Sequence, residues 1–117
     1  MPAYEIPNLR FSAESGAAVA RRRFVKIDAN EKGVQAAANT DAIVGASSQP
    51  TEKAGEVLEI YDGIVMVEAG AAITAGSAVM SDAQGRAVPF TAGSGALQAG
   101  VAMTNAGGAG ELVSIKI

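Results

Sequence analysis

Two glutamates in matching contexts are the first candidates for chemistry in this sequence. Glu56 and Glu111 each follow an Ala-Gly pair, and two carboxylates can divide the roles of general acid and general base. The sequence contains no His and no Cys, so it lacks the commonest base near neutral pH, thiolate nucleophiles and zinc ligands of the His and Cys type. Turn chemistry explains both glutamates, and we expect no catalytic residue and no enzymatic activity.

Three aspartates are candidates for a cation site. Asp28 and Asp82 precede Ala and Asp62 precedes Gly, but no dense Asp-x-Asp-x-Asp-Gly loop surrounds them. Local turns explain each aspartate, and we expect no bound metal. The Gly-rich run at 107–110 lacks the Lys-Ser/Thr ending of a phosphate-binding loop and precedes a predicted strand, so we expect no cofactor.

Basic residues are concentrated near the N-terminus. Residues 1–32 carry a local charge of +2 and residues 33–117 carry −5, which suggests that the two parts face different surroundings. The cluster Arg21-Arg22-Arg23 has no interleaved aromatic residues, so we expect no binding to nucleic acid. In a strand, Arg22 would point away from its two neighbours. The cluster then either binds carboxylates of a partner or forms a charged edge that prevents aggregation.

The elements that must position these residues begin with an irregular segment. Residues 1–20 show no sustained strand or helix period. Four large apolar side chains lie among prolines and polar residues within eight positions, which is more than a solvated tail needs. They are Tyr4, Ile6, Leu9 and Phe11. We expect an extended arm that docks through them, with an ordinary frayed terminus as the alternative.

The rest of the sequence is typical of β-structure with turns. Asp62-Gly63 lies between two runs of strand formers, and Asp-Gly in that context predicts a hairpin. The register of this hairpin places one side of both strands in the core, namely Leu58, Ile60, Val65 and Val67. The best helix candidate is a single turn near 69–76. Further strands are predicted at 24–27, 34–38, 43–47, 78–81, 86–88, 99–104 and 111–117.

The sequence contains an internal repeat. Aligned without gaps, residues 43–60 and 98–115 share five identities, among them Gly45 with Gly100. The matches fall on turn glycines and apolar strand positions, where geometry constrains the residue. The predicted organisation is an arm at 1–20 and a single β domain at 21–117, with similar modules at about 24–60 and 78–115 joined by the segment 61–77.

The predicted core is thin. Apolar residues make up 49% of the chain, but 25 of them are Ala, and there are only three Phe, two Tyr and no Trp. We therefore expect an isolated monomer to be marginally stable and other chains to complete its burial. No apolar run approaches the roughly 20 residues of a membrane span, and no signal-peptide pattern begins the sequence. We expect a soluble protein, made in the cytoplasm, that contacts no membrane.

Two phrases of the sequence resemble a known family. They are GIVMVEAGAAITAGSAVMSDAQGRAVP at 63–89 and AGVAMTNAGGAGELVSIKI at 99–117. In style and order they resemble the head decoration, or cement, proteins of bacteriophages, and the likeness covers about residues 16–117. The resemblance implies an all-β fold with a small β-barrel or β-tulip-like body, built from the two modules and carrying an extended N-terminal arm.

The same resemblance implies a structural virion protein that binds the outer surface of a phage capsid and cements the assembled shell. Its partners would be the major capsid protein and copies of itself, as a homotrimer over local three-fold positions or as a dimer, after synthesis in the host cytoplasm. The residues expected to contact the capsid are Tyr4, Ile6, Leu9, Arg10, Phe11, Arg21, Arg22 and Arg23.

A different class of function is the alternative: a β-domain of a viral tail or fibre, or a carbohydrate-binding module. Carbohydrate-binding modules usually expose aromatic platforms. This sequence has only five aromatic residues, and two of them lie in the predicted arm, so its composition favours the cementing interpretation.

Overall fold

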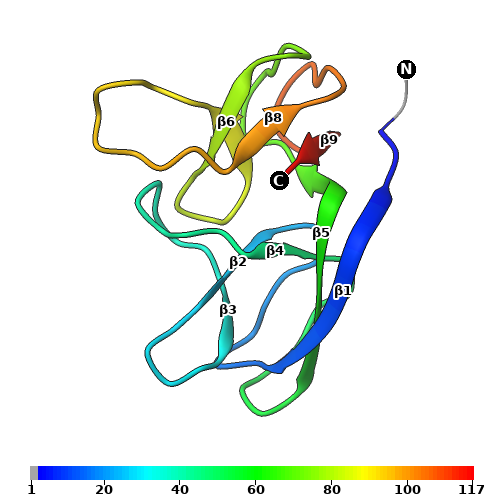
Figure 1. The fold of residues 1–117 in the computed structure, drawn as a ribbon, viewed down its shortest axis with the longest axis vertical. Helices are drawn as coiled ribbons and strands as arrows, with labels where there is room; N and C mark the ends of the chain where they lie inside the picture. Colours follow the sequence, from blue (N-terminus) through cyan, green and yellow to red (C-terminus); the bar gives the residue numbers. More distant parts are fainter. Residues whose placement is uncertain (1–2) are drawn as a thin grey trace.

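The structure is a computed structural model that describes residues 3–117. Within this range the chain is all-β, as predicted, and the helical turn considered near 69–76 does not form. The strands form one antiparallel sheet that curls round on itself (Figure 1). They are β1 (Ile6–Glu14), β2 (Phe24–Ile27), β3 (Gly33–Gln35), β4 (Gly45–Ser47), β5 (Val57–Glu68), β6 (Ala78–Ser81), β7 (Ala87–Pro89), β8 (Gly100–Ala102) and β9 (Leu112–Lys116).

Strand β5 is the longest element and runs through Asp62-Gly63 without turning, with 12 residues in all. Its first part pairs with β1 on one edge and β4 on the other, and its last part pairs with β9. The predicted hairpin is therefore wrong. Gly63 does adopt a positive φ of 98°, but it lies opposite an irregularity in β1 between Pro7 and Arg10. Asp-Gly here accommodates a β-bulge in the neighbouring strand.

The two faces of β5 serve two different cores. Successive side chains of a strand point to opposite faces. The residue numbers of Ile60 and Val65 differ by an odd number, so these two side chains point to opposite faces. Leu58 and Ile60 consequently lie in one buried cluster, while Val65 and Val67 lie in the other. In Figure 1 the first part of β5 belongs to the lower lobe of the molecule and the last part to the upper lobe.

The pattern of strand pairing occurs twice. Strand β2 pairs with β3 and β4, and β6 pairs with β7 and β8. Likewise β4 pairs with the first part of β5, and β8 pairs with β9. We call residues 10–61 the first module and residues 64–116 the second module. The segment 61–77, expected to join the modules, contains the last part of the shared strand and the chain that leads to β6.

Matching glycines occupy matching backbone environments in the two modules. A Cβ added to Gly45 would lie 2.5 Å from the carbonyl oxygen of Tyr61, and one added to Gly100 would lie 2.5 Å from that of Lys116. The turn glycines agree as well, with φ of 91° at Gly55 and 92° at Gly110. Glycine is needed at Gly45 and Gly100 because another backbone approaches closely, and at Gly55 and Gly110 because the turn is left-handed.

Each module curls until its first strand meets its third. Ser15, the residue after β1, forms a parallel bridge to Gly33, and Ala69, the residue after β5, forms the equivalent bridge to Ala87. These bridges make each module a half-barrel that holds a core on its inner side. The predicted small β-barrel body thus takes the form of two half-barrels that share one strand.

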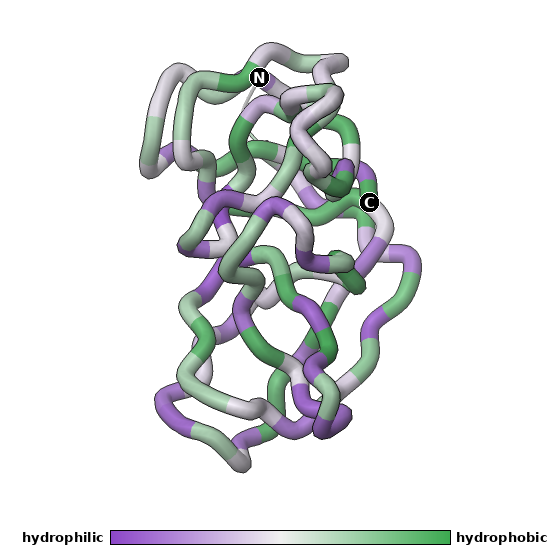
Figure 2. Tube along the Cα trace, turned by 90° about the vertical axis from the view of Figure 1, so that its left-hand side faces the viewer, coloured by the Kyte–Doolittle hydropathy of each residue, from purple (hydrophilic) through white to green (hydrophobic). Residues whose placement is uncertain are grey.

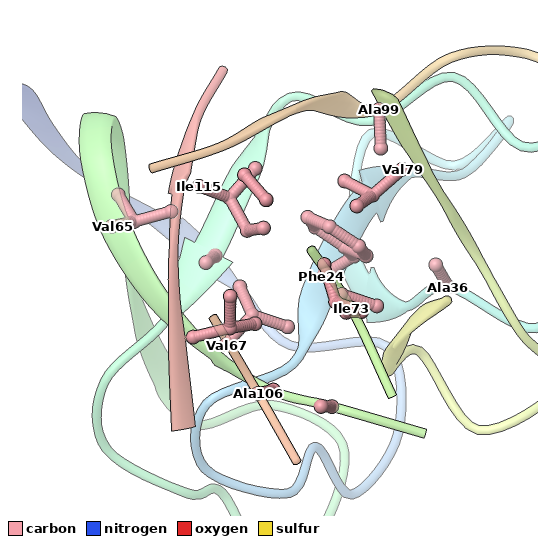
Figure 3. Close-up of a cluster of buried hydrophobic side chains, with 14 of the residues drawn as sticks. Phe24, Ala36, Val65, Val67, Ile73, Val79, Ala99, Ala106 and Ile115 are labelled. Carbon is pink, nitrogen blue, oxygen red and sulfur yellow. The ribbon is translucent and has the colours of Figure 1, made fainter. Parts of the chain in front are cut away.

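The two cores are built from equivalent positions. The first module buries Val19, Val25, Leu58 and Ile60, with Phe11, Ala13 and Val44 packed against them. The second module buries Ile73, Val79, Val113 and Ile115 at the matching positions, with Val65, Val67 and Ala99. It also receives four side chains from the first module, namely Phe24, Ala36, Ala46 and Tyr61. Phe24 and Ala36 are labelled in Figure 3. Burial of a side chain as large as Phe24 contributes roughly 1.5–3 kcal/mol, so these residues join the modules firmly.

The N-terminal segment does not form a separate extended arm. Residues 6–14 are strand β1, which pairs with β5 from Ile6 opposite Ile64 to Glu14 opposite Val57. The bulge after Pro7 interrupts the alternation of side chains, and this interruption explains why the sequence shows no strand period there.

The exposed surface of the single chain has the size expected of a compact fold. It measures 5738 Å², whereas a folded chain of 11.7 kDa typically exposes about 5,900 Å². The abundance of Ala therefore does not leave the chain unusually open. No helix in the described part of the chain is long and apolar enough to cross a membrane.

We predict that Gly100→Ala lowers the free energy of unfolding by about 1–3 kcal/mol, because the new methyl group overlaps the carbonyl of Lys116. Gly108→Ala is the matched control, since nothing lies within 4 Å of a Cβ at that position. Urea denaturation of both variants measures the difference. Equal midpoints would contradict the strand packing described here.

Candidate functional site

The predicted docking residues of the N-terminal segment lie along β1 and just before it. Ile6 and Leu9 are exposed, at 61% and 52% of their surface. Phe11 is half-buried and packs against the core of the first module. The structure therefore brings Ile6 and Leu9 to the surface of a paired strand, while Phe11 acts as part of the fold.

Polar contacts fix the path of this segment. The backbone N–H of Tyr4 donates to Oγ of Ser114 (2.7 Å), and that hydroxyl donates to the carbonyl of Tyr4 (2.6 Å). The backbone N–H of Leu9 donates to Oδ1 of Asp62 (2.9 Å), and the guanidinium of Arg10 lies 4.6 Å from the ring centre of Tyr61. These contacts hold the exposed side chains on a defined backbone, which reduces the entropy lost when they dock.

The three arginines of the basic cluster have separate surroundings. Residues 21–23 form a turn, in which Arg22 has a φ of 57°, so the alternation expected of a strand does not occur. Arg22 forms an ion pair with Glu5, and Arg23 forms one with Glu68 at 3.3 Å. Arg21 is exposed. The cluster is therefore not a single cationic surface.

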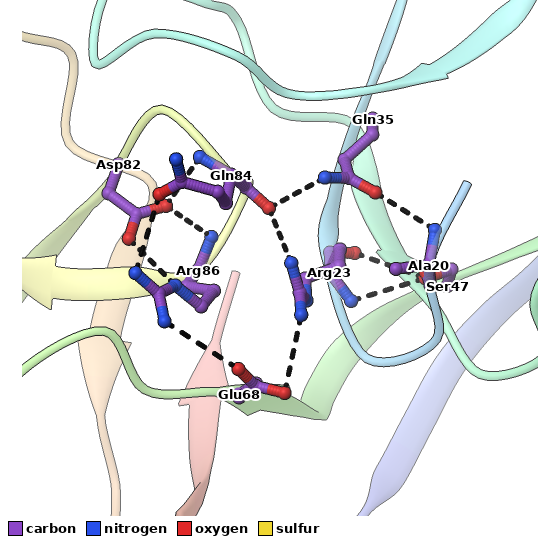
Figure 4. A network of polar contacts seen from close by, with 8 residues as sticks. All are labelled: Ala20, Arg23, Gln35, Ser47, Glu68, Asp82, Gln84 and Arg86. Atoms are coloured by element: carbon purple, nitrogen blue, oxygen red, sulfur yellow. Dashed lines mark hydrogen bonds and ion pairs between the residues drawn. The ribbon is translucent and has the colours of Figure 1, made fainter. Parts of the chain in front are cut away.

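Arg23 belongs to a polar network between the modules (Figure 4). Its guanidinium donates to the carbonyl of Gln84 (2.9 Å), which also accepts from the side-chain amide of Gln35 (2.7 Å). On the other side of the network, Arg86 pairs with Asp82 at 3.0 Å and approaches Glu68 at 3.8 Å. Charge-assisted hydrogen bonds of this kind are stronger than neutral ones, so Arg23 stabilises the contact between modules.

Four of the five carboxylates considered for chemistry accept backbone hydrogen bonds, namely Asp28, Glu56, Asp62 and Asp82. Oδ1 of Asp28 accepts the backbone N–H groups of Asn30 and Lys32 at 2.9 and 3.0 Å. Oδ1 of Asp82 accepts two backbone N–H groups in the equivalent turn, both at 2.8 Å. Oε1 of Glu56 accepts the N–H of Glu52. Among residues 3–117, no group of three or more His, Cys, Asp or Glu side chains is placed to hold a metal ion.

Asp41 is the carboxylate with a clearly shifted pKa. Burial by itself would raise the pKa of Asp41, but hydrogen bonds from the backbone N–H of Ala37 (2.8 Å) and Ala38 (3.0 Å) favour the charged form. The ammonium of Lys26, at 3.0 Å, favours it further. The net result is a pKa of Asp41 below the ordinary value. The ionised carboxylate of Asp41 therefore holds the loop that follows β3.

The repeat begins earlier than the sequence alignment placed it. Residues 14–18 (ESGAA) recur as 68–72 (EAGAA), and this match aligns Arg22 with Gly76. Gly76 has a φ of 88°. The N–H of Arg22 donates to the carbonyl of Ser47 in the first module, and the N–H of Gly76 donates to the equivalent carbonyl, that of Ala102, in the second module. This match was the signal in the sequence that could have placed Arg22 in a left-handed turn rather than in a strand.

Comparisons with known proteins cover nearly the whole chain. A family model described as phage cement protein matches residues 5–117. A solved structure of the N base of head fiber gp8.5 from bacteriophage phi29 has a TM-score of 0.72 at 23% identity, over 93% of this chain and 92% of that chain. At that identity the likeness shows the fold alone. No curated protein matches the chain.

We predict that Arg23→Ala lowers the free energy of unfolding by roughly 1–3 kcal/mol, because it removes the charged donor to Oε1 of Glu68 and to the carbonyl of Gln84. Arg21→Ala, at an exposed position of the same turn, should stay within about 0.5 kcal/mol of the wild type. Thermal melting compares the two. A larger loss for Arg21→Ala would contradict the assignment of Arg23 to the contact between modules.

We also predict that Asp41 makes stability depend on acid pH. Because its pKa is lowered in the folded state, its contribution is present above the pKa of the unfolded chain and is lost as pH falls through the folded value. Denaturant titrations of the wild type and Asp41→Asn at several pH values should converge in acid. A constant difference between the two at all pH values would refute this role.

Proposed function

The chain belongs to the phage cement protein family, and from this we propose that it binds the outer surface of a phage capsid and stabilises the assembled shell. Membership of this family makes it a phage structural protein. The partner proposed for it is the major capsid protein, which presents the same surface many times over the shell.

The observation that supports this proposal best is the exposure of Ile6 and Leu9 on a fixed strand. Both are large aliphatic side chains that are more than half exposed, and the contacts of Tyr4 and Asp62 hold the backbone around them. Exposed Arg21 could add a bidentate contact to a carboxylate of the shell. Arg22 and Arg23 are less suited to this role, since both are engaged within the chain.

Stabilisation of the shell follows from preferential binding. A protein that binds the assembled form and not the free subunits shifts the equilibrium toward assembly. The effect is repeated at every site of the shell, so a modest affinity at each site suffices. No chemical step is required of the protein in this role.

We further propose that the protein acts as a homotrimer, with a dimer as the alternative. Closed symmetry repeats one interface without producing open filaments, and a trimer would match the local three-fold positions of an icosahedral lattice. The likeness to cement proteins motivates this number. Light scattering of the free protein measures it.

A capsid-bound base for a fibre is a second candidate, favoured by the fold shared with the head fibre base. Both roles require binding to the shell, but only a cement protein should raise its stability. Thermal disruption of capsids with and without the bound protein separates the two roles, and an unchanged disruption temperature would favour the fibre base.

We predict that Ile6→Ser with Leu9→Ser weakens binding to capsids that lack the protein while leaving the fold intact. Each side chain contributes roughly 1.5–3 kcal/mol if it becomes fully buried, so the double variant should bind at least about 100-fold more weakly. Co-sedimentation measures binding, and melting of the free variant checks the fold. Deletion of residues 1–12 is a poorer test, because it removes most of β1 and the packed side chain of Phe11.

The control is Val57→Ser, which changes another exposed aliphatic residue, 75% exposed, near the opposite end of β1. This variant should bind as the wild type does. Unchanged binding of the Ile6 and Leu9 variant would refute the assignment of this surface to the shell.

A further inference from the structure

The outer side of the first module is a buried interface within the chain. In its strands, side chains that point away from its own core contact the second module instead. Phe24, Ala36 and Ala46 are 0%, 1% and 2% exposed and belong to the buried cluster of the second module. Phe24 lies at the centre of this cluster in Figure 3.

The same side of the second module is only partly covered by the described chain. The pairing of Phe24 with Ala46 recurs as Ala78 with Val101. The bond from the N–H of Ala36 to the carbonyl of Phe24 recurs from Phe90 to Ala78, at 2.9 and 3.0 Å. The second-module residues in these positions are half-buried instead of buried.

This partly covered side is apolar over three strands. Val79, Ala87 and Ala102 are buried in the core, so their apolar neighbours along the strands point outward. Phe90 follows the end of β7 and lies two positions beyond Val88, on the same side. We call the following residues the outer face: Ala78, Met80, Val88, Phe90, Val101 and Met103. Met80 pairs with Val88 across β6 and β7, and both line a shallow depression of about 330 Å³ beside residues 37–39. Met103 is 40% exposed.

The surroundings of the outer face carry little charge. Residues 69–117 contain only four charged side chains, at Asp82, Arg86, Glu111 and Lys116, and the first two pair with each other. Figure 2 shows the contrast, since hydrophilic residues gather mainly in the half of the molecule that holds the first module. Depletion of charge together with enrichment in Met and aromatic residues distinguishes the centres of protein interfaces from other surfaces.

We propose that the outer face is where copies of this chain contact one another, around a closed symmetry axis. The proposal deepens the oligomer part of the proposed function by naming its surface. Near a symmetry axis the same residues of different copies approach each other, so a charged side chain there would lie close to the same charge on another copy. A neutral apolar face avoids that repulsion, and the equivalent side of the first module already packs against protein.

The contact between copies does not repeat the contact between modules. That contact depends on Arg23 and Gln35 in the first module, and the equivalent residues of the second module are Ser77 and Pro89. It also needs the turn at Gly85, whose carbonyl accepts the N–H of Phe24 at 2.8 Å. Head-to-tail addition of copies would lack the side-chain bonds that Arg23 and Gln35 make, which leaves the outer face free to meet its own copies.

The test is the solution mass of the wild type and of two variants, measured by sedimentation equilibrium over a wide range of concentration. Met80→Glu with Met103→Glu places unpaired carboxylates in the contact and should weaken self-association at least about 100-fold. Val57→Glu changes an aliphatic residue of the first module that is 75% exposed and should leave the mass unchanged. Circular dichroism checks the fold, and Met103→Glu alone, at the more exposed of the two positions, serves if the double variant misfolds.

A wild type that is monomeric throughout, or a double variant that keeps the wild-type mass, would overturn the proposal. Co-sedimentation with capsids separates the possible failures. A monomer that binds capsids and loses binding on Met103→Glu would make the outer face a shell contact, which refutes self-contact and leaves the capsid role standing. An oligomer that dissociates as expected but never binds capsids would refute the capsid role alone.

Discussion

One strand with a core on each face governs this structure. Leu58 and Ile60 of β5 complete the first half-barrel, and Val65 and Val67 on the opposite face begin the second. The modules therefore cannot behave as two domains joined by a flexible linker, because β5 is both the last strand of the first module and the first strand of the second. Phe24 and the network around Arg23 and Glu68 hold the second module at a defined angle to the first. The positions of both exposed apolar surfaces follow from this arrangement.

The sequence predicted the class of fold and most strand positions, but not the central strand. In a tight hairpin, Ile60 and Val65 would share a face, and in a continuous strand they lie on opposite faces. Both arrangements bury the same four apolar residues. The choice between them depends on partners that are distant in sequence, namely β1 and β9, which occupy the two edges of β5 around Ile64. Local turn preference at Asp62-Gly63 favoured the wrong alternative, since the same residues also accommodate a bulge.

The sequence could identify candidate residues whose role depends only on their exposure. It could not identify roles that depend on partners distant in the sequence. The exposed aliphatic residues of the N-terminal segment were identified from their density among polar residues, although the strand that carries them was not. The roles of Arg22 and Arg23 depend on Glu5 and Glu68, whose proximity no local pattern reveals. The outer face of the second module was missed for a related reason. Its residues alternate with core residues, and a sequence cannot say which side of a strand lacks a neighbour.

The shared strand also determines the order in which a growing chain can fold. Both β1 and β4 pair with residues 57–64, so the first half-barrel has no closing strand until β5 has left the ribosome. Domains generally fold from the N-terminal end during synthesis, and pairing across such long stretches of sequence is slow compared with helix formation. Once β5 has paired with β1 as far as Ile64, Val65 and Val67 in its last part are available to pack against the strands that follow. The first half of the nascent chain thus becomes the template on which the second half is built.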